Sequence, residues 1–336
     1  MLEKNMNAKI AIITCWMGEY PVYFSLWVKS CEKNPHVDWI LIADRKPKEE
    51  LPSNIIFYQM SLSELQTRVK QEMDLDGFGL TSPYKLCDFR PIYGLLFKKE
   101  LQGYTHWGHC DIDLIWGCFE NFLTQDVLTD FDKVFTKGHL GIYKNTEDVN
   151  KRAWDKESLY PLSVITESPN FYAFDEYTGM ERIYRKKGYP YYKEAPYIDV
   201  SVRCQSSFLL NVSEKNYLQQ AFYWEDGKVY RVYINEKGEV STDEWLYLHF
   251  QKKSPPNYIN DVKHVKAFWI GPNGFYEKTD AQITVSDIEN YNPSITEKQK
   301  KQEEKAYIKL KLKQFFKKSF KDKCIHIKQR LSRIFF

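Results

Sequence analysis

Two carboxylates interrupt the apolar and aromatic stretch Trp107-Gly108-His109-Cys110-Asp111-Ile112-Asp113-Leu114-Ile115-Trp116-Gly117. The run from Trp107 to Trp116 predicts a buried strand and the end of that strand. An ionised carboxylate is costly in such surroundings unless something compensates its charge. A divalent cation does so, because carboxylate oxygens are hard ligands that bind Mg²⁺ or Mn²⁺. We therefore expect a metal site here, although one of the two aspartates could instead cap the following turn.

The sequence before this run predicts alternating strands and helices. Short apolar, β-rich runs indicate buried strands, and apolar residues at helical spacing after Pro21 indicate a helix. Ser61 and Glu64 have the spacing of a capping box and open a second helix. The expected strands are 9–16, 39–44 and 54–60, and the first expected helix is 21–33. This order is typical of an α/β fold with a Rossmann-like mixed, mostly parallel sheet flanked by helices.

The rest of the sequence is less regular. A helix is expected from the segment around Lys85 through Lys99, and residues 139–187 show no clear pattern. Two turn signals, at 226–227 and 237–238, predict a β-hairpin or meander. The run 245–250 predicts a last strand.

Composition limits the class of protein. Hydrophobic residues make up 43% of the 336 residues and aromatic residues 16%, so a sizeable core is expected and a largely disordered chain is excluded. The seven cysteines are scattered without a Cys-x-x-Cys pair, which indicates reduced thiols and no disulfide framework or zinc site. The first nine residues lack the apolar core of a signal peptide, and no apolar run approaches ~20 residues, the length of a membrane-spanning helix.

Charge is distributed unevenly. Residues 305–336 hold 11 of the 48 Lys and Arg but one of the 45 Asp and Glu, so this segment carries +10 and the remainder −7. Apolar residues recur at helical spacing in this tail, which predicts a basic amphipathic helix for an anionic membrane surface, or alternatively a helix packed on the body. The mildly acidic body argues against nucleic acid as a partner. We expect a catalytic domain at 1–291, a polar linker at 292–304 and the membrane-associating tail at 305–336.

Several segments together resemble bacterial glycosyltransferases of the GT-A fold, in particular poorly characterised enzymes of capsule and surface-polysaccharide biosynthesis. The resemblance covers about residues 9 to 253, in the order that this fold requires. The segments are Thr14-Cys15-Trp16, Asp44, Lys85-Leu86-Cys87-Asp88-Phe89-Arg90-Pro91, Cys110-Asp111-Ile112-Asp113-Leu114, Ala173-Phe174-Asp175-Glu176 and Leu248-His249-Phe250-Gln251-Lys252. The resemblance implies a GT-A-like fold and a nucleotide-sugar donor.

The resemblance also implies a metal site. Asp113 would ligate Mn²⁺ or Mg²⁺ directly, and Asp111 would contact the metal through water, or the ribose or sugar of the donor. His249 resembles the late histidine that completes this site, and neutral imidazole is an adequate ligand for Mn²⁺. His249 could alternatively be a hydrogen-bonded core residue. Lys252 would lie near the diphosphate, or could be a solvated residue at the end of the strand.

Other residues would bind the donor or take part in catalysis. Thr14, Trp16 and Asp44 lie at the carboxyl ends of expected strands, the ligand-binding edge of such sheets, although Asp44 could be a turn residue. Lys85 and Asp88 lie about one helical turn apart and could meet phosphate and sugar hydroxyls, or form a local ion pair. Asp175 or Glu176 would be the general base, or the two could form an exposed acidic turn. Arg90 is a weaker candidate, and His139 is expected to be an ordinary polar loop residue, although it could line the pocket.

The sequence therefore predicts a metal-dependent glycosyltransferase of the hexosyltransferase type. It would move a sugar from a nucleotide donor, of the UDP class, to a glycan or a lipid-linked acceptor. Its expected location is the cytoplasm, as a peripheral protein on the inner face of the cell membrane. Two alternatives use the same residues differently: a metal-dependent nucleotidyl- or phosphotransferase, and a carbohydrate-binding protein without catalytic activity.

Overall fold

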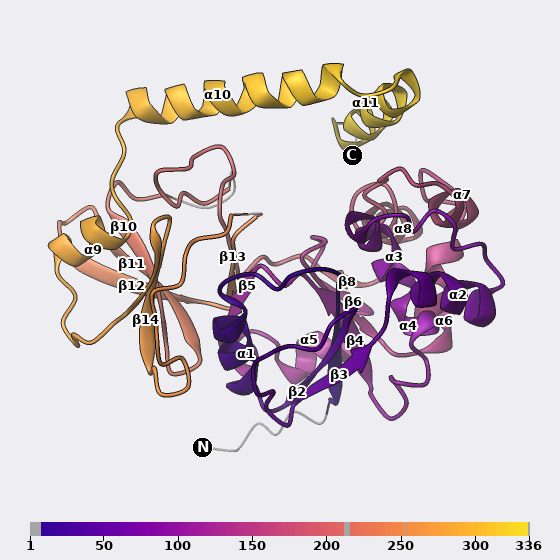
Figure 1. Cartoon of the computed structure of the whole chain (residues 1–336), viewed down its shortest axis with the longest axis horizontal. Coiled ribbons are helices and arrows are strands. Elements are labelled where there is room, and N and C mark those ends of the chain that lie inside the picture. The colour runs from indigo at the N-terminus through magenta and orange to yellow at the C-terminus, as the bar shows by residue number, and fades with distance from the viewer. Residues whose placement is uncertain (1–7, 212–215, 252, 335–336) are drawn as a thin grey trace.

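The structure is a computed structural model that describes residues 8–211, 216–251 and 253–334. Its centre is a seven-stranded mixed sheet in which the strands on one side run parallel (Figure 1). The spatial order is β3 (Ile55–Gln59), β2 (Val37–Ala43), β1 (Ile10–Trp16), β4 (His106–Cys110), β7 (Leu140–Lys144), β6 (Lys133–Val134) and β8 (Tyr191–Tyr192). The predicted α/β class with a parallel-rich sheet and flanking helices is confirmed.

Local chemistry explains the first elements. The strands β1 and β2 are apolar runs whose side chains are almost all buried, as strands covered on both faces require. Helix α1 (Phe24–Glu32) packs Trp27 against Trp39 of β2, with ring centroids 6.0 Å apart. Helix α2 (Leu62–Met73) begins with the predicted capping box, in which the Ser61 and Glu64 side chains bond to each other's backbone amides.

The predicted single strand from Trp107 to Trp116 is wrong. Strand β4 ends at Cys110, and β5 (Leu114–Trp116) belongs to a different, three-stranded sheet. There it pairs with β13 (Tyr247–His249), which also pairs with β9 (Ile198–Asp199). The bend 111–113 therefore connects two sheets. This bend brings the two aspartates beside β13, because Leu114 is the register partner of His249.

A group of short helices lies on one side of the main sheet. The helix expected to run through Lys99 is broken at Pro91, since proline lacks the amide hydrogen that a helix interior needs. Residues 139–187 are also more regular than expected. The helices of this group are α3 (Leu86–Phe89), α4 (Tyr93–Leu96), α6 (Glu147–Lys151), α7 (Leu162–Glu167) and α8 (Met180–Lys187), with 3-10 turns at Pro83–Lys85, Arg90–Ile92 and Arg152–Trp154. Elsewhere a 3-10 turn (Phe119–Asn121) and α5 (Gln125–Asp130) follow β5.

The predicted meander is confirmed as part of a five-stranded antiparallel sheet, seen on the side of the molecule opposite the short helices (Figure 1). Two of its strands follow the run that had been expected to be the last strand. The sheet contains β12 (Val240–Trp245), β11 (Lys228–Ile234), β10 (Gln220–Glu225), β14 (Ala267–Gly271) and β15 (Gly274–Glu277), and α9 (Val285–Tyr291) packs on one face.

Two helices end the chain, and Figure 1 shows α10 (Glu297–Phe316) extending across the molecule to α11 (Phe320–Ile334). Helix α10 already begins within the segment expected to be a linker. Helix α11 rests on the body through Ile325 and the buried Gln329, which donates to the carbonyl oxygen of Phe171 at 3.0 Å. None of the helices in the described ranges combines the length and apolarity that a bilayer crossing requires.

Candidate active site

Asp111, Asp113 and His249 form a cluster at the junction of the two sheets. One ligand atom from each side chain lies within 4.8 Å of the others. The His249 Nε2 atom is 3.5 Å from Asp113 Oδ1 and 3.7 Å from Asp111 Oδ2. The aspartate side chains keep 27% and 20% of their surface exposed, so an ion and a ligand can reach them. Two carboxylates and one imidazole are a donor set that fits Mn²⁺ or Mg²⁺.

The imidazole of His249 is oriented by Asp199, a residue that the sequence reasoning missed. The Nδ1 atom of His249 is 2.8 Å from Asp199 Oδ1. Burial alone lowers the pKa of His249, but Asp113 and Asp199 outweigh it and raise the pKa to about 10. Burial raises the pKa of Asp199, but the bond to His249 prevails and the pKa falls to about 2. Metal binding at His249 Nε2 must displace the proton that these carboxylates hold there.

Arg90 connects the metal cluster to the acidic segment 175–176. Its guanidinium bonds to the carboxylate of Asp111, to Asp175 Oδ2 at 3.0 Å and to the carbonyl oxygen of Gly138 at 2.8 Å. Burial raises the pKa of Asp111 and, more strongly, that of Asp175, while the Arg90 charge opposes both shifts. This weak sequence candidate thus holds two of the predicted site residues together.

Asp175 and Glu176 lie next to Gly138. Asp175 is buried, which contradicts the alternative of an exposed acidic turn, and Glu176 accepts a hydrogen bond from the Gly138 amide at 2.9 Å. A Cβ atom at position 138 would lie 2.4 Å from Asp175 Oδ2, so glycine is needed for this close approach. A buried carboxyl with a raised pKa suits proton transfer near neutral pH. The role of either acid as the general base stays a prediction.

Lys85 and Asp88 form a fully buried ion pair of 2.8 Å. Lys85 also donates to the carbonyl oxygen of Asn170, and Asp88 accepts from the amides of Tyr172 and Phe174 at 2.9 and 3.0 Å. Burial lowers the pKa of Lys85 and raises that of Asp88. The pair therefore supports the segment that leads into Asp175, and direct binding of the donor by either residue stays a prediction.

The remaining candidates occupy neighbouring strand ends. Thr14 is buried and its hydroxyl lies 2.8 Å from Cys110 Sγ, next to Asp111. Asp44 follows β2 and accepts from the Gly18 amide at 3.0 Å.

The half-buried Trp16 donates its indole hydrogen to the carbonyl oxygen of Glu19 in the same loop. A nucleotide-binding role for Thr14, Trp16 and Asp44 stays a prediction. Lys252 lies outside the described residues.

His139 lies in the turn before β7, as expected, but it is buried beside the cluster. Its ring centroid is 4.4 Å from that of His249, and its Nδ1 atom is 2.8 Å from the Tyr247 hydroxyl. Within the described ranges, Nε2 of His139 has no hydrogen-bond partner. Burial, followed by the charge of His249, holds the pKa of His139 well below its usual value. His139 therefore lines the site as a neutral imidazole.

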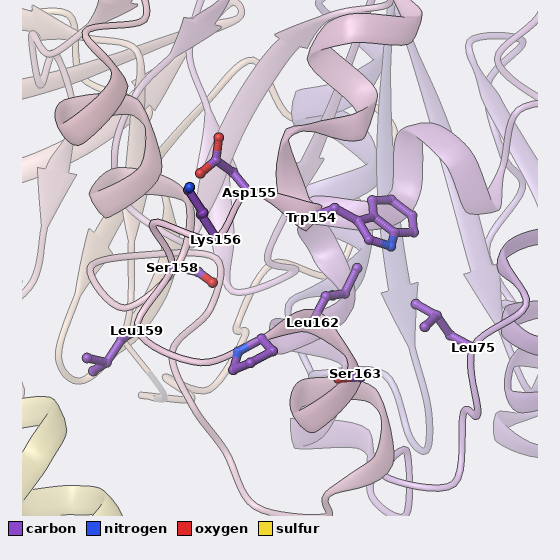
Figure 2. A pocket seen from close by; sticks show the side chains of 9 residues that line it. Leu75, Trp154, Asp155, Lys156, Ser158, Leu159, Leu162 and Ser163 are labelled. Atoms are coloured by element: carbon purple, nitrogen blue, oxygen red, sulfur yellow. The ribbon is translucent and has the colours of Figure 1, made fainter.

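A separate cavity of about 480 Å³ lies among the short helices (Figure 2). It contains none of the site residues named above. Its lining includes Leu75, Trp154, Lys156, Leu159, Pro161 and Leu162.

Comparison with known proteins gives a family and many solved structures, among them a galactosyltransferase and a xylosyltransferase. No curated protein matches the sequence. The galactosyltransferase LgtC, solved with donor and acceptor sugar analogues, is 11% identical with a TM-score of 0.29, over 43% of this chain and 62% of that chain, which is less than two thirds of its length. Mouse xyloside xylosyltransferase 1, in its apo form, is 10% identical with a TM-score of 0.38, over 57% of this chain and 88% of that chain. The sequence profile of one family matches residues 12–279, so the chain belongs to a family of unknown function, DUF6625.

Proposed function

We propose that the protein is a metal-dependent glycosyltransferase of the hexosyltransferase type that uses a nucleotide-sugar donor of the UDP class. The observation that carries this proposal is the cluster of Asp111, Asp113 and His249 at the carboxyl edge of the parallel strands, where ligands of such sheets bind. When bound, Mn²⁺ or Mg²⁺ would neutralise charge on the departing diphosphate. A binding protein would not need this donor set next to a buried carboxyl whose pKa is raised.

The chain's own residues would divide the remaining work. Arg90 pairs with both Asp111 and Asp175, so it would fix the position of the acidic segment 175–176 relative to the metal ligands. For direct attack by the acceptor hydroxyl, Asp175 or Glu176 would accept its proton as the new bond to the anomeric carbon forms and the bond to the diphosphate breaks. Thr14, Trp16 and Asp44 would hold the nucleoside side, and Lys252 the diphosphate.

Thermal unfolding with Mn²⁺ and UDP tests this proposal. A ligand at 100 times its Kd stabilises the native state by about 2.7 kcal/mol, which raises the melting temperature measurably. We expect this rise in the native protein and its loss in Asp113→Ala. The matched control is Asp226→Asn, in a distant turn where φ is +44° and asparagine is well tolerated. The absence of a rise with any nucleotide would contradict the proposal.

We further propose that the C-terminal helices dock on an anionic membrane, which would bring the site to a lipid-linked or surface-polysaccharide acceptor at the inner face of the membrane. Phe320, Ile327 and Leu331 are exposed at 83%, 49% and 48%. Their spacing places them on one face of α11, whereas Ile325 and Gln329 face the body. The lysines and arginines of the tail complement acidic lipids.

Sedimentation with vesicles tests the docking. The full chain should bind vesicles that contain phosphatidylglycerol, and the triple substitution Phe320→Ser, Ile327→Ser and Leu331→Ser should remain in the supernatant. A control with Val22→Ser and Val240→Ser changes two exposed apolar residues elsewhere and should bind normally. Equal binding of all three proteins would show that α11 is not the docking face.

A further inference from the structure

Asp199, which contacts His249, is held by more hydrogen bonds than a structural histidine requires of its partner. Asp199 Oδ1 lies 2.8 Å from His249 Nδ1 and accepts from Gln251 Nε2 at 2.5 Å, while Asp199 Oδ2 accepts from Asn211 Nδ2 at 2.7 Å. We propose that Asp199 is a positioning residue that holds His249 Nε2 toward the metal. This inference rests on the proposed function, because it concerns the same metal site.

The hydrogen-bond pattern sets the tautomer of His249. Because the Asp199 carboxylate can only accept, Nδ1 of His249 carries the hydrogen of their bond. The lone pair that remains for a metal is then on Nε2, the atom that faces Asp111 and Asp113. A carboxylate that orients the far nitrogen of a metal-bound histidine fixes the ring and increases its basicity as a ligand.

The backbone supports the same arrangement. Gln251 has φ of +49°, a left-handed conformation that is uncommon for residues other than glycine. Its amide is thereby placed on Asp199, two residues after His249. On the opposite side, the side-chain amide of Asn211 donates a hydrogen bond to Asp199 Oδ2. The backbone amide of Asn211 donates to the carbonyl oxygen of Asp199 at 2.8 Å. The backbone therefore tolerates strain at Gln251, which supplies one of the hydrogen-bond donors that hold Asp199.

The neighbouring group His139, Asp199 and His249 also brings its ligand atoms within 4.8 Å of one another. A cation there would have to displace the His249 proton, and it would compete with the amides of Gln251 and Asn211 for the oxygens of Asp199. The existing bonds therefore favour an orienting carboxylate over a second ion at this position.

Mn²⁺ binding to the full-length protein, followed by the electron paramagnetic resonance signal of free Mn²⁺, tests the inference. We expect Asp199→Asn to weaken binding by roughly 10- to 100-fold, as loss of such orienting carboxylates does. Gln251→Gly, which suits the positive φ, removes one donor to Asp199 and should weaken binding less. Asp226→Asn should bind like the native protein.

The outcomes separate the two claims. If the native protein does not bind Mn²⁺, the proposed metal site itself is wrong. If the native protein binds and both folded variants bind equally well, Asp199 does not position His249. Nitrogen-15 NMR of the imidazoles with the diamagnetic ion Mg²⁺ gives a second reading: the native protein should show the Nδ1-protonated form of His249 when Mg²⁺ is bound, and Asp199→Asn should lose that preference. An unchanged tautomer in Asp199→Asn would also overturn the inference.

Discussion

Replacing Arg90 with methionine would leave two carboxylates without the guanidinium that they share. The side chains of Arg90 and Asp175 are 11% and 3% exposed, so their pair is effectively buried, whereas Asp111 keeps 27% and contact with His249. Removing one partner of a buried ion pair destabilises a protein by about 3–5 kcal/mol. Because Asp111 retains some compensation, we expect Arg90→Met to lower the free energy of unfolding by about 3 kcal/mol at pH 8.

The loss should depend on pH. Burial already raises the pKa of Asp175 in the native state, and removing Arg90 raises it further. The native state of the variant then holds a proton that the unfolded state, with a carboxyl pKa near ~3.9, has released. Stability relative to the unsubstituted protein should therefore recover as the pH falls from 8 toward 5, by at most about 1.4 kcal/mol for each pH unit between the Asp175 pKa of the variant and the lower Asp175 pKa of the unsubstituted protein.

Urea unfolding at pH 8 and at pH 5 measures both effects. Arg45→Met is the matched control, since its partners Glu19 and Asp44 are 87% and 32% exposed and loss of such surface pairs changes stability by less than ~1 kcal/mol. A loss below ~1 kcal/mol for Arg90→Met at pH 8, or a loss that is the same at both pH values, would refute the reasoning.

Substitutions at three further positions test the site and the fold around it. Gly138→Ala should abolish sugar transfer while leaving Mn²⁺ binding near the native value, because the new Cβ displaces Asp175; unchanged turnover would contradict this. Lys85→Met should lower the free energy of unfolding in urea by about 3–5 kcal/mol, since it leaves Asp88 buried without its partner. Lys85→Arg keeps the positive charge and changes only the shape of the side chain, so it separates the effect of charge from that of packing. Ser61→Ala should cost about 1 kcal/mol through loss of the cap of α2, with transfer activity unaffected.

Sequence reasoning succeeded where the pattern is local. The buried runs of β1 and β2, the Ser61–Glu64 capping box and the turns of the meander all depend on neighbouring residues, and the structure contains each of them. The pairing of the two aspartates with His249 was anticipated through resemblance, because no local signal connects residues 136 positions apart.

The remainder depends on contacts between distant segments. Position 199 carries a weak local signal, an acid within the short apolar run 197–200, which is the same kind of signal that identified Asp113. Arg90 gains its importance from Asp111 and Asp175, which only the folded chain brings together. The strand around Asp111 was mispredicted because one apolar run serves two sheets, and hydrophobicity does not reveal the bend between them.

The most direct test of the central claim is release of UDP from a panel of UDP-sugars in the presence of Mn²⁺. We expect slow release from at least one UDP-sugar, abolished by EDTA, restored by added Mn²⁺ and lost in Asp113→Asn but not in Asp226→Asn. Release that persists in EDTA and in Asp113→Asn, or no release from any member of the panel by a protein that binds Mn²⁺, would contradict a metal-dependent glycosyltransferase centred on Asp111, Asp113 and His249.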